Sequence, residues 1–513
     1  MLLVEVRDLK IAFGTEALLS DVSFAVNDSD RIGLIGNNGT GKTTLLRVLM
    51  GLQEHDAGTV TRRSSLRMSY VQQELPEKEW GARLRDFVRE GTGEDERAYS
   101  EYRVDMVLDQ LRFPREQRDL SLWQLSGGWR RLAMIARAWL QDPDVLLFDE
   151  PSNHLDLESL MILENWLTST VSCPYVLSSH DREFLDRCTT SSIVLSGGRA
   201  QVVRSPFSAA MAEVEARRAA AERQRLVEEK EVSRLEASAK RLAVWGKVFD
   251  SPDLSRRAKA IESRIRQMRD EMTHVHAVPR RAINLAESQQ RARRVLDVAP
   301  HHLSKPDGSP LLRIAGFSVI KGDKILLLGL NGSGKSTLLR TIAASFSRGG
   351  LGRASNHSHF TFNPQVDLVF LDQDLGILSE DETAYAFVER RTSLTRTELT
   401  RRLVQGGFDA RIQSHRIRDL SYGQRARLAF LVLDLLEPNF YVLDEPTNHL
   451  DIEGRERLES ELMKPGVSCL MTTHDRRMLR AVGTRFLLIE KGQLKFIDSP
   501  SLFFERAIEA IRP

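Results

Sequence analysis

One twelve-residue segment occurs twice in this chain. LLFDEPSNHLDL occupies residues 146–157 and YVLDEPTNHLDI occupies residues 441–452, and the charged and turn-forming letters are kept while mainly apolar ones change. The copies lie 295 positions apart. This pattern indicates either a repeated core element that also carries chemistry or a duplicated enzyme with two active sites.

The repeat continues on both sides of this segment. Four more pairs of matching segments occur in the same order in both halves of the chain. They are GNNGTGKT (36–43) with GLNGSGKS (329–336), YVQQE (70–74) with FLDQD (370–374), LSGGWRRLA (125–133) with LSYGQRARLA (420–429), and SSHDREFL (178–185) with TTHDRRML (472–479). We therefore predict a duplicated domain at 1–205 and 301–513, with a linker at 206–300. A chain of 513 residues is long enough for two or more domains.

Each copy has the apolar pattern of an α/β fold. IGLIG and ILLLG are short buried-strand patterns that run into a glycine-rich turn and then a helix. DVLLFDE and FYVLDE are continuous apolar strands, as expected for a parallel sheet covered on both faces. We predict two α/β domains.

The pattern GxxxxGK[ST] in both copies is that of a phosphate-binding loop. Its glycines let successive backbone N–H groups point at phosphates, and the next helix offers its positive N-terminal end. Lys42 and Lys335 are predicted to neutralise phosphates, and Thr43 and Ser336 to ligate Mg²⁺. The predicted ATP contacts of the two loops are Gly36, Asn37, Asn38, Gly39, Thr40, Gly41, Lys42, Thr43, Thr44, Gly329, Leu330, Asn331, Gly332, Ser333, Gly334, Lys335, Ser336 and Thr337.

Two acidic residues end the apolar strand of each copy. Asp149 and Asp444 stand where an α/β sheet presents its ligands, and we predict that they join the Mg²⁺ shell through water. Glu150 and Glu445 follow them and are predicted to be general bases that polarise the attacking water. The alternative, in which the Asp–Glu pair only caps the next helix, is disfavoured by the phosphate loops upstream.

Together these motifs resemble the ATP-binding cassette superfamily. LSGGW and LSYGQ are similar to its signature motif, and SNHLD and TNHLD to its D-loops. The resemblance implies Q-loop glutamines at Gln73 and Gln373, which we assign to the Mg²⁺ shell. It also implies catalytic switch histidines that contact the γ-phosphate at His180 and His474, with ATP and Mg²⁺ as cofactors.

In this superfamily the two cassettes face each other head to tail. The resemblance therefore implies that the first phosphate loop binds ATP together with Ser421 and Gly423. The second loop is expected to use Ser126, Gly127 and Gly128. ATP then joins the two cassettes and hydrolysis releases them, which is a two-state switch.

Two departures from the superfamily pattern predict unequal sites. Tyr422 replaces the first glycine of the second signature pair, which is expected to narrow that site or alter its hydrolysis. Phe13 stands where the family stacks an aromatic ring on adenine, whereas the second copy has KPDGSP there, without an aromatic residue.

The segment between the copies has a different composition. Residues 209–245 are rich in Ala, Glu, Arg and Leu, without Pro or Gly, and predict one long helix. GKVFDSPDLS interrupts it at Gly246 and Pro252, and RRAKAIESRIRQMRDEM predicts a second helix. Residues 211–300 carry 20 Lys and Arg against 14 Asp and Glu, a net charge of +6 in a chain whose total is +2. The positive charge therefore lies in the linker.

The linker and the DEP[ST]NHLD motifs resemble the ABC-F group of ribosome-associated translation factors. Trp129 after the first signature fits the same group, and only about 50 residues separate Gln73 from Leu125, which leaves no room for the arm insertion of some members. The resemblance implies a helical hairpin that enters the ribosomal E site and reaches toward the P-site tRNA. The alternatives are an antibiotic-resistance factor that protects the ribosome, a fused ATPase subunit of a membrane importer, or a DNA-repair ATPase. The last needs cysteine clusters or a far longer insert.

The expected partner is the ribosome, contacted electrostatically through rRNA and tRNA. Trp245 is expected either to stack on a base or to pack the hairpin's own turn. The predicted RNA-binding residues are Arg241, Lys247, Arg256, Arg257, Lys259, Arg264 and Arg266.

Three scattered cysteines exclude a disulfide framework and fit a reducing, cytoplasmic compartment. The charged N-terminus is no signal peptide, and no apolar run approaches the roughly 18 residues that span a bilayer. We expect a cytoplasmic monomer in which the two cassettes close on each other.

Overall fold

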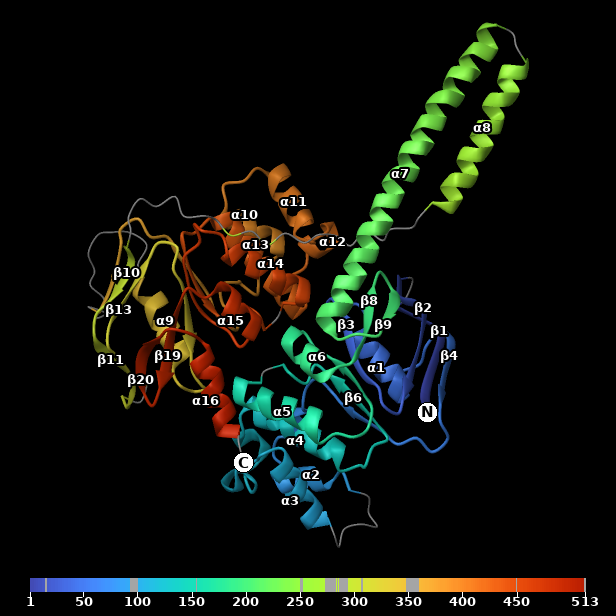
Figure 1. Ribbon diagram of the computed structural model, residues 1–513. Helices are drawn as coiled ribbons and strands as arrows, with labels where there is room; N and C mark the ends of the chain where they lie inside the picture. The colour runs from blue at the N-terminus through green and yellow to red at the C-terminus, as the bar shows by residue number, and fades with distance from the viewer. Residues whose placement is uncertain are drawn as a thin grey trace.

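Two α/β cassettes lie side by side, and a helical hairpin projects away from them (Figure 1). The computed structural model describes residues 1–13, 16–92, 100–153, 155–249, 252–272, 283, 285, 294–305, 308–346, 359–448 and 450–511. This architecture confirms the predicted fold class of two α/β P-loop cassettes joined by long helices.

The first cassette is built on a six-stranded sheet in the order β5-β6-β7-β3-β8-β9. All neighbouring strands are parallel except β8 and β9. A smaller antiparallel sheet, β2-β1-β4, lies beside it. The strands are β1 (Leu2–Phe13), β2 (Glu16–Asn27), β3 (Arg31–Gly36), β4 (Ala57–Arg62), β5 (Met68–Val71), β6 (Val145–Asp149), β7 (Tyr175–Ser178), β8 (Ser191–Ser196) and β9 (Arg199–Val203).

The second cassette repeats this plan with an eight-stranded sheet, β11-β12-β20-β19-β14-β18-β17-β16, and a three-stranded sheet, β13-β10-β15. The predicted boundary at residue 301 falls after β10, which pairs with two strands of this cassette. The strands are β10 (Arg294–Val298), β11 (His301–Ser304), β12 (Pro310–Ile314), β13 (Phe317–Ile320), β14 (Lys324–Leu328), β15 (Phe360–Phe362), β16 (Leu368–Leu371), β17 (Phe440–Asp444), β18 (Cys469–Thr472), β19 (Arg485–Glu490) and β20 (Gln493–Ile497).

Central strands β6 and β17, which end at the predicted Mg²⁺ aspartates, are buried along their whole length. Helices cover both faces of each sheet, as continuous apolar strands require. In the first cassette they are α1 (Lys42–Met50), α2 (Leu84–Arg89), α3 (Ser100–Gln110), α4 (Gly127–Trp139), α5 (Leu157–Ser169) and α6 (Arg182–Cys188). In the second they are α9 (Lys335–Ser345), α10 (Ala384–Arg391), α11 (Arg396–Gln405), α12 (Ala410–Gln413), α13 (Tyr422–Leu436), α14 (Ile452–Leu462), α15 (Arg476–Val482) and α16 (Ser501–Ile511).

The linker forms a hairpin of α7 (Phe207–Val248) and α8 (Pro252–Glu271). The sequence predicted that the first helix would break at Gly246. Helix α7 instead continues through Gly246 and ends at Val248. Helix α8 begins at Pro252, because proline at the first helical position removes only an N–H that has no partner there. The seam between the helices is apolar and consists of Val232, Leu235, Ala239, Ile261, Ile265, Met268 and Met272.

The cassettes exchange apolar residues across their boundary. Leu157, at the start of α5, is buried in a core cluster made mainly of the second cassette. Ile452, its counterpart at the start of α14, is buried in the core cluster of the first. The C-terminal helix α16 lies against α5, so the end of the chain also contacts the first cassette (Figure 1).

Candidate functional site: two ATP sites between the cassettes

The first phosphate loop connects β3 to α1 and holds its lysine by backbone and side-chain contacts. The Nζ of Lys42 donates to the carbonyl oxygen of Gly36 at 2.8 Å. It lies 3.3 Å from Nε2 of His180 and 3.8 Å from Oε1 of Glu150. The loop enters α1 at Gly41, whose φ of 96° is left-handed and favours glycine. Lysine, glutamate and histidine therefore meet at one point, as the motifs predicted.

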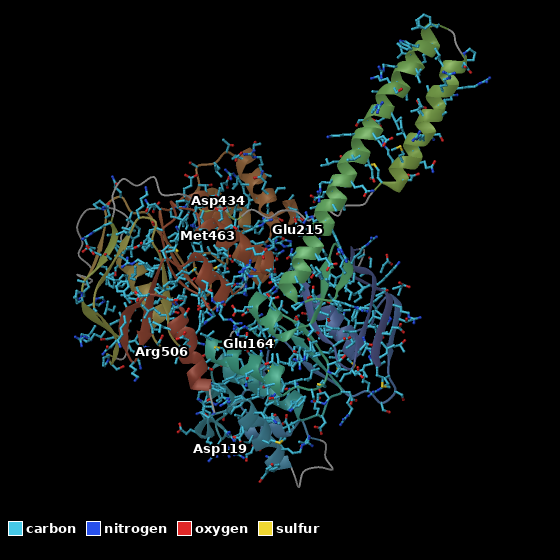
Figure 2. The ribbon with its side chains drawn as sticks, in the orientation of Figure 1. Asp119, Glu164, Glu215, Asp434, Met463 and Arg506 are labelled. Carbon is cyan, nitrogen blue, oxygen red and sulfur yellow. The ribbon has the colours of Figure 1, made fainter. Side chains whose placement is uncertain are left out.

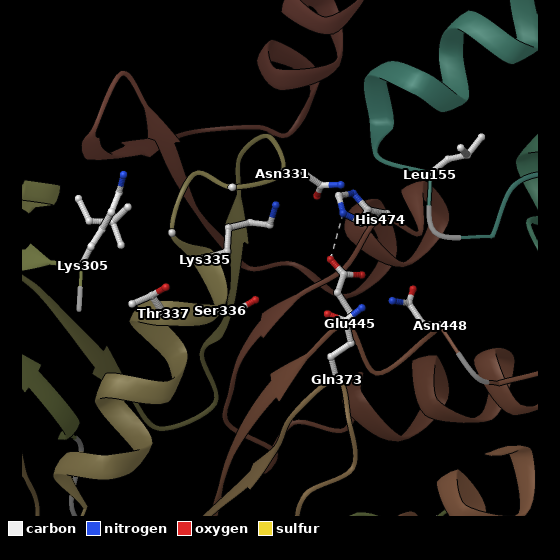
Figure 3. Close-up of a pocket in the computed structure, with 13 residues that line it drawn as sticks. Leu155, Lys305, Asn331, Lys335, Ser336, Thr337, Gln373, Glu445, Asn448 and His474 are labelled. Atoms are coloured by element: carbon white, nitrogen blue, oxygen red, sulfur yellow. Dashed lines mark ion pairs between the residues drawn. The ribbon is translucent and has the colours of Figure 1, made fainter. Parts of the chain in front are cut away.

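The second phosphate loop has the same form. The Nζ of Lys335 donates to the carbonyl oxygens of Gly329 at 2.7 Å and Leu330 at 3.1 Å. Gly334 begins α9 with a φ of 102°. Lys335, Glu445 and His474 line one cavity, and a dashed line joins the last two (Figure 3).

The glutamates after β6 and β17 share an unusual backbone. Glu150 has a φ of 50° and Glu445 a φ of 51°, a left-handed conformation that is uncommon for residues with a side chain. One oxygen of each carboxylate lies 3.2 Å from Nε2 of its switch histidine, His180 or His474. Each glutamate lines the same cavity as the phosphate loop of its cassette, which is the position expected of the predicted general base.

Burial changes the proton affinities at the first site. It raises the pKa of the Glu150 carboxyl, Lys42 opposes this rise, and Asp149 adds to it. Burial also lowers the pKa of His180 well below its ordinary value, and the positive charges of Lys42 and Arg455 lower it further. A carboxylate with a raised pKa is a stronger base. The N–H of a neutral imidazole can donate a hydrogen bond to a phosphate oxygen.

The strand-end aspartates differ in their hydrogen bonds. Asp149 accepts from the hydroxyls of Tyr70 at 3.0 Å and Ser178 at 3.1 Å. Asp444 accepts from Thr472 at 2.7 Å, and its other oxygen is buried without a partner. Phe370 stands in the second copy at the position of Tyr70, so the hydroxyl is missing there. Sequence analysis did not assign this difference.

These residues fit Mg²⁺ bound with ATP. One buried oxygen of Asp444 has no partner, and Ser336, Gln373 and the neighbouring Glu445 line the second cavity. Thr43 and Gln73 line the cavity of the first site. In the described part of the chain no three His, Cys, Asp or Glu side chains could hold a metal ion alone. Mg²⁺ commonly takes one or two protein oxygens plus phosphates and water, and it would neutralise phosphate charge.

The first phosphate loop and the second signature share a cavity of about 1040 Å³. The amide nitrogen of Asn38 lies 3.4 Å from the position that a Cβ on Gly423 would take. The amide of Asn37 donates to Glu453 of the second cassette at 3.0 Å. From the first cassette the lining includes Asn38, Gly39, Gly41, Lys42, Thr43, Thr44, Gln73, Glu150 and His180, and from the second Ser421, Tyr422, Gly423 and Gln424. The structure thus brings these two predicted halves together.

The second phosphate loop lines a smaller cavity, of about 470 Å³. Leu155 is the residue of the first cassette that lines it. Burial lowers the pKa of Lys335, and the negative charge of Asp156, also from the first cassette, is among those that raise it again. Ser126, Gly127 and Gly128 are not among its lining residues, so the structure does not bring the first signature into this cavity. Gly128 instead packs against Ser159 and Leu155. The two sites are unequal in size and in the residues of the opposite cassette that line them.

The segments predicted to contact adenine also differ between the two cassettes. The side chain of Phe13 lies outside the described residues. In the second cassette the hairpin between β11 and β12 places Lys305 and Leu311 on the cavity wall, with Thr337 nearby (Figure 3). Lys305 therefore lines the second cavity from the KPDGSP segment, which has no aromatic residue.

All predicted RNA-binding residues of the linker are exposed on α7 and α8. Side chains project along the whole hairpin (Figure 2). Trp245 is 52% exposed, and Val248 and Phe249 beside it are 68% and 70% exposed. The indole is therefore about half exposed at the end of α7. Among the residues described, no helix is long and apolar enough to cross a membrane.

Two P-loop domains in one chain, each with a helix that starts at the signature sequence and a strand-end glutamate 3.2 Å from a histidine, define a tandem-cassette ATPase. The family model described as ABC transporter matches residues 19–153 and 312–448. The chain therefore belongs to the ABC transporter family, and its two cassettes make it an ATPase.

Similar proteins extend the match beyond the cassettes. ABC transporter F family member 5 of Arabidopsis thaliana is 27% identical over 99% of this chain and 78% of its own length. Ribosome protection protein VmlR of Bacillus subtilis is 28% identical over 96% of this chain and 88% of its own. ATP-binding protein Uup of Escherichia coli is 28% identical over 96% and 81%. These relatives confirm the predicted resemblance to the ABC-F group.

A crystal structure of the archaeal ribosome recycling factor aABCE1, with the stalk protein aP1, has the same fold. It aligns with a TM-score of 0.65 over 98% of this chain and 92% of its own, at 17% identity. At that identity the likeness shows the fold alone.

Proposed function

We propose that this protein is a ribosome-binding translation factor whose two ATP sites control the position of the hairpin. The observation that carries the proposal is the hairpin itself, because a fused ATPase subunit of a membrane importer would need only a short linker between its cassettes. Helix α7 has 42 residues and projects beyond both cassettes (Figure 1). The relatives of this protein include a ribosome protection protein that aligns with nearly the whole chain.

The charge of the hairpin supports RNA as the partner. Arg256, Lys259 and Arg264 are exposed on α8, whose side chains face solvent on every side except the seam with α7. Such cations bind phosphates by releasing counterions and do not require a base sequence. At the tip, Trp245 and Phe249 add exposed rings that can stack on unpaired bases.

In this proposal ATP closes both sites and hydrolysis opens them. Glu150 and Glu445 polarise the attacking water, and Lys42 and Lys335 hold the phosphates. The predicted metal ligands and signature residues keep the roles assigned from sequence. The hairpin, which leaves the first cassette directly after β9, moves with the closing of the cassettes toward the ribosomal E site and the P-site tRNA. The protein acts as a cytoplasmic monomer.

A ribosome-protection factor for antibiotic resistance is the second candidate. The observation that favours it is the relative VmlR, named a ribosome protection protein. Drug susceptibility of cells with and without the protein separates this candidate from a general translation factor.

The test uses Glu150→Gln with Glu445→Gln to hold ATP between the cassettes. Lysate containing this variant is run through a sucrose gradient with ATP, and its position is compared with that of ribosomes. Co-migration with ribosomes that ends when ATP is removed supports the proposal. Sedimentation at the top, with the protein recovered on membranes or DNA, would contradict it and favour the importer or repair alternative.

A further inference from the structure

Two buried arginines cross the boundary between the cassettes. Nη2 of Arg182, the first residue of α6, donates to Oε2 of Glu459 on α14 at 2.7 Å. Nη2 of Arg476, the first residue of α15, donates to Glu164 on α5, which lies at the boundary between the cassettes (Figure 2). The two arginine side chains are only 2% and 3% exposed.

The two contacts are copies of one another. Each arginine follows the switch histidine of its own cassette by two residues, in SHDR and THDR. Glu164 and Glu459 lie 295 positions apart, as do the repeated strands. Each cassette therefore extends the same side chain to the same helix of the other, which gives the pair a local twofold relationship.

The arginines also contact the opposite switch segment. Arg182 lies 3.6 Å from Asp475, the residue after His474. Arg476 lies 3.7 Å from Asp181, the residue after His180. A cation that is buried this deeply needs its carboxylate partners, because an unpaired buried charge is strongly unfavourable. The contacts therefore hold only when the two switch segments keep one relative position.

One further cation makes the two contacts unequal. Arg455 on α14 is 8% exposed, and its Nη1 lies 3.7 Å from Asp475. The corresponding residue of the first cassette is Leu160. Asp475 thus lies between two arginines, one from each cassette, whereas Asp181 has no such second arginine from α5.

We propose that Arg182 and Arg476 are positioning residues that couple the two ATP sites. When one site closes, its arginine draws the helix and switch segment of the other cassette into place. Opening of either site would separate buried charges, so the sites open and close together. Coupling of this kind appears as cooperative ATP binding, with a Hill coefficient that can reach the number of sites. The inference rests on the ATPase activity and does not depend on ribosome binding.

The test replaces both members of one pair by methionine, as Arg182→Met with Glu459→Met. Removing both charges leaves neither one buried alone, and Asp475 keeps Arg455 as a partner, so we expect the thermal midpoint to stay within a few degrees. Equilibrium ATP binding is measured in the Glu150→Gln, Glu445→Gln background, in which we expect hydrolysis to be about 100-fold slower or more. We expect the Hill coefficient to fall from about 2 to about 1 and the apparent affinity to weaken about tenfold.

The matched control is Arg480→Met. Arg480 also crosses the boundary, to Glu183 at 2.6 Å, but it is 49% exposed and should leave the Hill coefficient unchanged. If the double variant unfolds, Arg182→Lys keeps the buried charge but loses the forked geometry, and it too should lower the Hill coefficient.

Three outcomes overturn the proposal. In the first, the parent protein binds two ATP without cooperativity. In the second, Arg182→Lys and the methionine pair bind as cooperatively as the parent. In the third, the parent binds no ATP at all, which would also remove the assignment of the ATP sites.

Discussion

The hydroxyl of Tyr422 donates to the carbonyl oxygen of Gln373 at 2.6 Å. Tyr422 lines the first ATP cavity, and Gln373 lines the second, so this bond joins the signature of one site to the Q-loop of the other. In the first cassette Arg131 makes a similar bond, from its Nη1 to the carbonyl of Gln72 at 2.6 Å. The tyrosine that departs from the superfamily pattern therefore has a structural role in its own cassette.

We expect Tyr422→Phe to slow ATP hydrolysis. The substitution keeps the ring and removes one hydrogen bond, worth about 1 kcal/mol, or roughly fivefold if the Q-loop must be held for catalysis. Steady-state kinetics should show a fall in kcat with little change in KM. Tyr102→Phe is the control, since Tyr102 is 75% exposed. Equal rates for Tyr422→Phe and the parent would show that the bond has no catalytic role.

Glu150→Gln and Glu445→Gln test the two general bases separately. Loss of proton transfer at a site should lower its hydrolysis about 100-fold or more, while ATP binding is retained because glutamine has nearly the same shape. Single-turnover assays with ATP bound at one site would measure each rate. Glu262→Gln on the exposed face of α8 is the control. Rates that fall less than threefold in the double variant would contradict the assignment.

Stability should depend on pH through His180. Burial lowers its pKa, and Glu150, Lys42 and Arg455 are the charged groups around it. The folded protein therefore keeps the ring neutral, whereas the unfolded chain binds a proton below pH 6.5. Because the unfolded state takes up the proton, stability is lost as the pH falls, by about 1 kcal/mol between pH 6.5 and 5.5.

Urea unfolding at several pH values measures this effect as the difference between the parent and His180→Asn. The difference should shrink as the pH falls below 6.5. A difference that does not change with pH would mean that His180 can be protonated in the folded state.

Local sequence was sufficient for the phosphate loops, the strand-end carboxylates and the switch histidines. In each case a short motif includes both the turn and the candidate side chain, as in GNNGTGKT before α1. The buried strands β6 and β17 followed from their continuous apolar pattern. The two-helix linker was predicted as well, although α7 extends through Gly246 because one glycine costs a long helix only about 1 kcal/mol.

The contacts between cassettes were beyond this kind of prediction. Arg182 and Glu459 are 277 positions apart, and their pairing depends on how two folded domains meet. The sequence nevertheless contained a signal. The arginine follows the histidine by two residues in both copies, in the repeated segments SHDR and THDR. The hydroxyl of Tyr70 was missed for a similar reason, since the Tyr-to-Phe difference between the copies has meaning only beside Asp149.

Lys305→Phe should strengthen ATP binding at the second site. Stacking of a base on an aromatic ring contributes about 1–3 kcal/mol, so the gain should be roughly tenfold. The affinity is measured in a Lys42→Ala background, which weakens the first site. Lys305→Ala separates removal of the lysine from addition of the ring. Equal affinities for the Phe and Ala variants would show that residue 305 does not contact the base.

Arg256→Glu with Arg257→Glu tests the hairpin as the ribosome contact. Both side chains are exposed on α8, and Arg257 has only a 3.7 Å exposed ion pair with Asp253, so the fold should tolerate the change. Replacing two cations by two anions removes phosphate contacts and adds repulsion. We expect co-sedimentation with ribosomes to be lost while ATP hydrolysis without ribosomes is unchanged.

Arg217→Glu with Arg218→Glu makes the same charge change near the cassette end of α7 and should retain most ribosome binding. Because the tip contacts are electrostatic, the parent's affinity should fall steeply with added salt, and the slope should decrease in a variant that still binds weakly, such as Arg256→Gln. Ribosome binding by the Arg256→Glu, Arg257→Glu variant at the parent's affinity would place the RNA contact elsewhere. Loss of ATP hydrolysis together with binding would instead indicate a folding defect and remove the support for these two residues.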